Sequence, residues 1–213
     1  MRFNAEKNKS SNTALLRSEG IEVVDHLPHL DQPKFRSSTA VAERCLVLAA
    51  LVQLHFGAPR DHLTKWLKEN QLDDSVTAHE SQLLGTDFGD LPQQRQIDVY
   101  WFIEAIWALA WVGELHQNLS LKTPVEDSLA AMLPSVEKME RTEKFVHDFA
   151  LRGESEIFST LDYFYRAHWF ARNCQLAGSE SDLANLDIIM ERRKALEWVC
   201  DSSLDWDDVP LDT

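Results

Sequence analysis

The chain has 213 residues, of which 44% are hydrophobic, so it can bury one large core or two smaller ones. Its 21 Lys and Arg against 35 Asp and Glu give a formal net charge of −14 at pH 7, and a surface this acidic repels phosphate groups. We therefore expect neither nucleic acid nor an anionic membrane as a partner. The three cysteines, Cys45, Cys174 and Cys200, form no CxxC motif and indicate buried thiols in a reducing cytoplasm.

The N-terminal region changes its sequence pattern twice. Residues 1–11 are polar and lack the apolar segment of a secretory signal, so we expect a disordered tail. Residues 12–19 predict a short helix with Asn12 as its cap. Residues 21–35 contain two prolines and predict an extended segment. We therefore expect a single α-helical domain over residues 12–213.

The middle of the chain contains several stretches with helical spacing of apolar residues or with helix-start signals. Thr77 and Glu80 form the pattern of a capping box, and Thr123 followed by Pro124 is a second helix start. The longest apolar run, 99–113, contains a glutamate and is too short to span a bilayer. The predicted helices are 37–56, 59–70, 77–84, 95–112, 123–134 and 136–151.

Residues 156–176 predict the helix around which the others pack. They contain no glycine or proline, and apolar side chains point in nearly every direction around the helix axis, which is typical of a buried central helix. We expect 95–112 and 186–200, the last predicted helix, to flank it. The sequence thus predicts an all-α (mainly α) fold. It is a single-domain irregular helical bundle around a buried central helix, with a short extended N-terminal segment.

Charged side chains on this central helix need partners, because an isolated buried charge is strongly destabilising. Asp162 and Arg166 are spaced to pair along the helix, and we also expect Arg166 or Arg172 to pair with Glu104 or Glu191. In one interpretation these groups line a pocket, where Arg172 or Arg166 holds a carboxylate or phosphate of the ligand and His168 moves a proton. In the other they form a buried polar network that fixes helix register. The ligand-binding candidates are His168, Arg172, Arg166, Asp162, Glu104, Glu191, Arg192 and Trp169.

Signals for other chemistry are weak. His26 and His29 are spaced to share a zinc ion, but no third ligand has a clear spacing, so we expect no metal and no cofactor. The sequence contains no GxSxG motif and no glycine-rich phosphate loop. Cys174 points away from His168 on the same helix, which excludes a Cys–His pair there. Catalytic residues stay unknown, and the sequence does not decide whether the protein is an enzyme.

The stretches YFYRAHWFAR in the central helix, ERRKALEWV in the last helix and WDDVPLDT at the end are similar to the bacterial domain-of-unknown-function 4272 family. WFIEAIWALAWVG at 101–113 supports the likeness, which covers most of the chain from about residue 12. Glu197 departs from the pattern, where an amide side chain is expected. The resemblance implies a cytosolic bacterial protein. It brings no known activity, so no catalytic residue is carried over, but the residues of the family pattern overlap the ligand-binding candidates.

Two functions remain open. The first is a non-catalytic interaction module that binds a basic protein partner through its acidic surface, and a contiguous acidic or apolar surface patch would support it. The second is a binding protein or enzyme for a small anionic ligand, with His168, Arg172 and Glu191 in a helical cleft. A pocket that reaches these side chains, with a perturbed titration, would support it. The oligomeric state does not follow from the sequence.

Overall fold

The computed structural model describes residues 3–179 and 181–212, and their regular secondary structure is helical, as predicted. One isolated parallel β-bridge joins Lys34 to Asp201. The chain forms two compact units, each assembled from separate stretches. The described residues of unit 1 lie in 3–36, 118–124 and 152–212, and those of unit 2 lie in 37–117 and 125–151. That residues 12–213 act as one domain stays a prediction.

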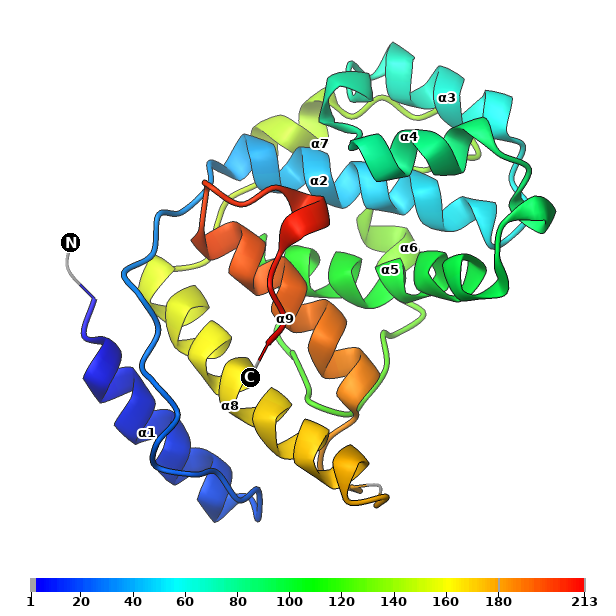
Figure 1. Cartoon of the computed structure of the whole chain (residues 1–213). Coiled ribbons are helices and arrows are strands. Elements are labelled where there is room, and N and C mark those ends of the chain that lie inside the picture. Colours follow the sequence, from blue (N-terminus) through cyan, green and yellow to red (C-terminus); the bar gives the residue numbers. More distant parts are fainter. Residues whose placement is uncertain (1–2, 180, 213) are drawn as a thin grey trace. The chain divides into compact units, whose positions relative to one another are not determined.

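Unit 1 is built around α8, Glu154–Leu176 (Figure 1). This helix packs against α9, Leu186–Cys200, and against α1, Ala5–Ser18. The predicted central helix is therefore confirmed as the middle helix of its unit, with α9 as one neighbour. The other expected neighbour, α5 (Gln93–Val112), belongs to unit 2, and within unit 1 its place is taken by α1.

The N-terminal helix is longer than the sequence predicted. It begins at Ala5 and is capped by the side chain of Asn4, so the disordered tail predicted for 1–11 is wrong over residues 5–11. Asn12, the expected cap, lies inside the helix and is buried. The weak helical signal of this polar stretch is outweighed by the packing of α1 against α8, because tertiary contacts supply most of the stability of a helix. The first two residues lie outside the described part of the chain.

The extended segment predicted for 21–35 is present, and its end is hydrogen-bonded to the chain around the end of α9. The Lys34 N–H donates to Cys200 O at 2.7 Å, and the Ser202 N–H donates to Lys34 O at 2.8 Å. Trp206 then packs its ring edge-on against Trp198, with ring centroids 5.5 Å apart. These contacts fix the C-terminal segment, including the short helix η4 (Trp206–Asp208), to α9.

The helices of unit 2 surround α2, Ser38–Leu51, which is buried along most of its length. It contacts α3, α4, α5 and α7. The predicted capping box is confirmed, since the Thr77 side chain accepts a hydrogen bond from the Glu80 N–H and the Glu80 carboxylate accepts one from the Thr77 N–H. The other elements of the unit are η1 Val52–Leu54, α3 Arg60–Glu69, η2 Asp73–Ser75, α4 Ala78–Gly85, η3 Phe88–Asp90, α5 Gln93–Val112, α6 Leu129–Met132 and α7 Glu143–Asp148.

Two predicted helices of unit 2 are much shorter than expected. The stretch 123–134 contains only α6, and 136–151 contains only α7. Between them the chain is held by contacts with the core rather than by helical hydrogen bonds. Trp66 Nε1–H donates to Glu140 O at 2.9 Å, and Val136 is 5% exposed in the cluster around Trp66. Backbone groups satisfied by such contacts need no helix, which explains the difference.

Candidate functional site

Asp162 and Arg166 form a buried ion pair in unit 1. Arg166 Nη2 lies 2.7 Å from Asp162 Oδ1 and Nε lies 2.9 Å from Oδ2, and the two side chains are 0% and 1% exposed. The Asn12 amide donates to Asp162 at 2.9 Å, and Arg166 also donates to Pro28 O at 3.0 Å. The pair predicted from the i,i+4 spacing is confirmed. It links α8 to α1 and to the extended segment, as a structural network does.

Arg193 of α9 connects His168 to the C-terminal segment. Its Nη1 lies 2.8 Å from His168 Nδ1 and 3.0 Å from Asp212 O, to which it donates, and its Nη2 lies 3.1 Å from Glu197 Oε1. Burial and the positive charge of Arg193 lower the pKa of His168 to about 4, while burial raises the pKa of Glu197. His168 is therefore neutral at pH 7, and its Nδ1 accepts the hydrogen bond. A general base acting near neutral pH needs a pKa closer to 7.

Two further arginines differ sharply in their surroundings. Arg192 is 0% exposed and donates to the backbone oxygens of Ser120 and Thr123, which belong to the same unit. Arg172 is exposed and donates to Gln175 Oε1 on its own helix. Arg192 therefore holds a loop in place, and Arg172 lies at the surface rather than in a buried network.

The remaining predicted residues lie in separate environments. Trp169 is half-buried and lines a cavity of unit 1, and Glu191 is half-buried on α9. Glu104 lies in unit 2, where it is 2% exposed and its Oε1 accepts a hydrogen bond from the Val125 N–H at 3.1 Å. Both arginines of α8 take partners on α8 itself, so the expected pairing with the two glutamates is wrong. Neighbours one turn away along a helix reach each other without the entropy cost of a long-range contact.

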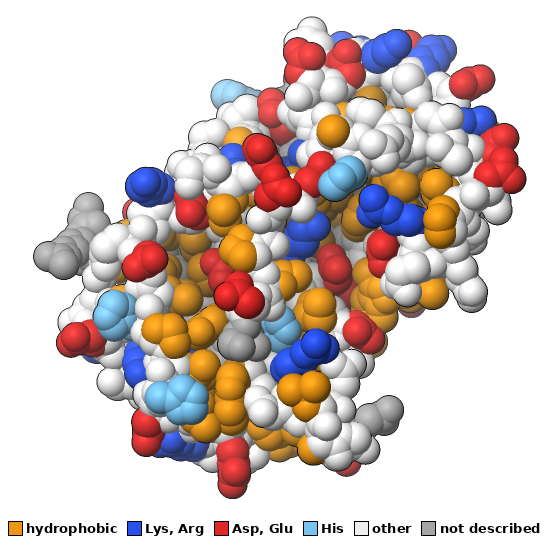
Figure 2. Space-filling view, in the orientation of Figure 1, with side chains coloured by type: hydrophobic (Ala, Val, Ile, Leu, Met, Phe, Trp, Pro, Cys, Tyr) orange, Lys and Arg blue, Asp and Glu red, His pale blue; other side chains and the backbone are white. Residues whose placement is uncertain are grey.

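Unit 2 exposes a cluster of apolar and aromatic side chains where η1 ends and α5 begins. The ring of His55 is at its centre, 4.9 Å from Tyr100, 5.3 Å from Phe56 and 6.1 Å from Phe88 between centroids. Phe56 is 61% exposed, Tyr100 41% and Ile97 40%. We call these five residues the Phe56 patch. Hydrophobic side chains reach the surface among acidic and basic ones in the space-filling view (Figure 2). Neighbouring large apolar side chains left exposed are typical of interaction surfaces.

The backbone holds Phe56 away from the core. Leu54 is 2% exposed and fills the core side of η1. Gly57 follows with a φ of +83°, and its N–H donates to Leu54 O at 3.1 Å while the Ala58 N–H donates to Gln53 O at 3.0 Å. Glycine adopts this left-handed conformation without the strain that other residues bear. The exposure of Phe56 therefore results from a hydrogen-bonded turn.

Carboxylates lie beside the patch. Asp87, Asp90 and Asp98 are each within two residues of one of its members along the chain. Arg60 pairs with Asp87, and Arg95 is an exposed base nearby. The charges beside the patch are therefore mixed, and it is the net charge of −14 on the whole chain that favours a partner of positive charge.

The sequence analysis did not find the Phe56 patch. The stretches 37–56 and 95–112 were predicted as helices with apolar residues at helical spacing, and such residues usually face the core. One signal in the sequence was available. Gly57 is a typical residue for ending a helix, so Phe56 before it is a large apolar side chain at a helix end, where burial in the core is less certain.

Fold and surface together define an all-α protein with an apolar patch on one of its two helical units. The profile of the family described as "Domain of unknown function (DUF4272)" matches residues 7–209, so the chain belongs to this family. No curated protein and no solved structure matches it. Within residues 3–179 and 181–212, no helix has both the length and the hydropathy to cross a membrane. The same residues contain no group of three or more His, Cys, Asp or Glu side chains placed to hold a metal ion.

Proposed function

We propose that the protein is a non-catalytic interaction module of the bacterial cytoplasm that binds a basic protein partner through the Phe56 patch. The observation that carries this proposal is the exposure of Ile97 and of Phe56 and Tyr100, whose rings lie beside the ring of His55. Energetically dominant residues of interfaces are enriched in large aromatic side chains that are surrounded by a polar rim. The patch has this composition, and the exposed Asp90 follows Phe88 by two residues along the chain.

The net charge of the chain supports a basic partner, and its free cysteines support a location in the cytoplasm. A net charge of −14 accelerates the approach of a basic protein and repels acidic ones, so binding should weaken as salt is added. Cys45, Cys174 and Cys200 are free thiols, which suits a reducing cytoplasm. Membership of the family supports a bacterial origin, since the resemblance found in the sequence is to a bacterial family.

Binding of a small anionic ligand by His168, Arg172 and Glu191 stays a prediction that the geometry supports less well. The Arg166 guanidinium forms a buried ion pair with Asp162, and Arg172 lies exposed at the surface rather than in a cleft with His168. His168 is 2% exposed and accepts from Arg193, so its ring is already engaged.

Comparative purification tests the proposal. Tagged wild-type protein and a Phe56→Ser/Tyr100→Ser variant are isolated gently from the native cells, and the proteins bound to each are quantified by mass spectrometry. Loss of an aromatic anchor costs about 2 kcal/mol or more, which is about 30-fold in affinity. We therefore expect a basic protein that is retained by the wild type and depleted at least about tenfold with the variant.

Leu176→Ser is the matched control, because it removes a side chain that is 73% exposed on unit 1. It should retain the partner. Equal recovery of every bound protein with the wild type and the double variant would contradict the proposal, provided that circular dichroism shows both to be folded.

A further inference from the structure

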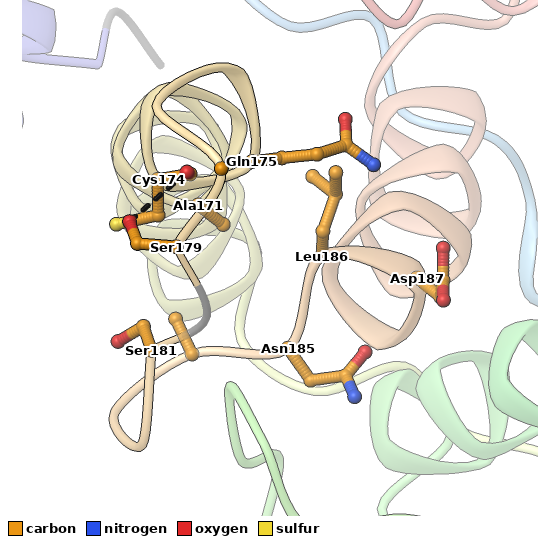
Figure 3. A pocket seen from close by; sticks show the side chains of 10 residues that line it. Ala171, Cys174, Gln175, Ser179, Ser181, Asn185, Leu186 and Asp187 are labelled. Atoms are coloured by element: carbon orange, nitrogen blue, oxygen red, sulfur yellow. Dashed lines mark hydrogen bonds between the residues drawn. The ribbon is translucent and has the colours of Figure 1, made fainter.

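Two cavities of unit 1 meet at the C-terminal end of α8. The first, which we call the polar cavity, has a volume of about 430 Å³ and lies between the end of α8 and the start of α9 (Figure 3). The second, the apolar cavity, has a volume of about 310 Å³ and lies between α8 and residues 22–24. Cys174 and Ser179 line both. Both volumes lie within the range of small-molecule sites, and the two shared lining residues make the cavities adjacent.

The apolar cavity offers aromatic and branched aliphatic surface. Trp169 and Phe170 are half-buried, so part of each ring faces the space. Val23, Val24 and Ala177 complete the apolar wall. Covering such rings with an apolar group is favourable by about 25 cal/mol for each Å² removed from water. This cavity therefore suits the hydrophobic body of a ligand.

The polar cavity offers hydroxyl and amide groups. Gln175 and Ser179 enter from the end of α8 and the turn that follows it, Ser181 from the connecting loop, and Asn185 from the start of α9 (Figure 3). The Ser179 hydroxyl donates to Cys174 O at 3.1 Å, so its oxygen presents lone pairs as an acceptor. Gln175 Oε1 accepts a hydrogen bond from Arg172, and Asn185 Oδ1 accepts one from the Ile188 N–H, so each amide also presents an NH2 donor. The cavity therefore offers both acceptors and donors to a polar head group.

The electrostatics of the two cavities favour a positive head group. Asp187 lines the polar cavity and Glu22 lines the apolar one, and the linings contain no Lys or Arg among the described residues. Arg172 borders the polar cavity through its hydrogen bond to Gln175, so two carboxylates face one guanidinium and the balance of charge is negative. α8 ends here with no basic residue in its last turn, so the negative end of its dipole is not neutralised by a side chain of its own. The positive end of α9 is offset by Asp187 in its first turn.

We propose that these cavities bind a small amphipathic amine, with its aromatic or branched body against Trp169 and Phe170 and its ammonium group in the polar cavity near Asp187. This site is separate from the Phe56 patch, which lies in unit 2, and the proposal does not depend on the interaction function.

Alkylation of Cys174 by N-ethylmaleimide reports occupancy of the cavities. Cys174 is half-buried, whereas Cys45 and Cys200 are 0% and 3% exposed. Burial raises the pKa of Cys45 to about 12 and also raises that of Cys200, so both react slowly. The rate at Cys174 is followed by peptide mass spectrometry on the full chain with phenethylamine or, at equal concentration and ionic strength, 3-phenylpropanoate.

Phenethylamine should slow the alkylation at Cys174 saturably, at least about threefold, and 3-phenylpropanoate should leave the rate unchanged. Asp187→Asn should weaken the protection by the amine about fivefold in apparent affinity, as expected for loss of one charge-assisted contact of about 1 kcal/mol. Asp182→Asn makes the same charge change at an exposed position of the loop that precedes α9 and should leave the protection intact. No protection by the amine, equal protection by both compounds, or equal affinity of Asp187→Asn and wild type would each overturn the proposal.

Discussion

Replacing Arg166 with methionine measures how much the buried polar network stabilises unit 1. The Arg166 guanidinium makes two charge-assisted hydrogen bonds to Asp162 and one to Pro28 O, and the side chain is 0% exposed. Arg166→Met leaves the Asp162 carboxylate 1% exposed in the native fold, with an amide hydrogen bond from Asn12 but no counter-charge. Removal of one partner from a buried pair costs about 3 to 5 kcal/mol. This is a large part of the total stability of about 5 to 15 kcal/mol that is usual for a folded protein.

Urea unfolding followed by circular dichroism gives the free energy of unfolding for each variant. We expect Arg166→Met to lose about 3 to 5 kcal/mol, and Arg172→Met, the same change at an exposed position of α8, to stay within about 0.5 kcal/mol of the wild type. Asp162→Leu combined with Arg166→Met removes both charges and should lose less than Arg166→Met alone. If Arg166→Met unfolds within about 1 kcal/mol of the wild type, the network is not structural and the reasoning fails.

Further predictions concern a histidine, a glycine and a second buried pair. The pKa of His168 is about 4 in the folded protein and about 6.5 when unfolded, so between these values the unfolded state binds more protons and stability falls as the pH is lowered. His168→Gln keeps an acceptor for Arg193, so its free energy of unfolding should fall less than that of the wild type between pH 7 and pH 4.5. The same pH dependence of the free energy of unfolding in both proteins, measured by urea unfolding, would refute this. Gly57→Ala places alanine at a φ of +83°, and its Cβ would meet no atom within 4 Å, so any loss of stability comes from backbone strain. The free energy of unfolding should fall by about 1 kcal/mol in the same assay, and an unchanged value would show that the backbone is not strained there. Arg44→Met leaves Glu80, which is 2% exposed, without its ion-pair partner and should cost about 3 to 5 kcal/mol in thermal or urea unfolding, whereas a loss below about 1 kcal/mol would show that the pair is not stabilising.

Local signals predicted the parts of this fold that depend on neighbours in the sequence. The capping box at Thr77, the apolar helix α8 and the pair of Asp162 with Arg166 each follow from residues within one or two helical turns. Residues 5–11 were mispredicted because α1 is held by α8, which is far away in the sequence. Helical periodicity shows that a helix has a buried face but does not identify the helix that covers it.

The candidate site was harder to predict for the same reason. Arg192 is satisfied by backbone oxygens of a loop, and no side-chain pattern reveals such acceptors. His168 was predicted as a group that could move a proton, yet Arg193 and burial keep it neutral. The Phe56 patch depends on which apolar residues remain uncovered after packing, and that follows from the assembled unit and not from the spacing of its residues.

Site-specific photo-crosslinking tests the interaction function most directly. The photoreactive amino acid p-benzoylphenylalanine is placed at Phe56 in one variant and at Leu176, which is 73% exposed in unit 1, in another. The native cells are irradiated, and adducts are identified by mass spectrometry. We predict a discrete adduct between the Phe56 variant and one basic protein, lost when Tyr100→Ser is added, and no such adduct from the Leu176 variant. Absence of any protein adduct at Phe56, or the same adducts from both positions, would contradict the proposed function.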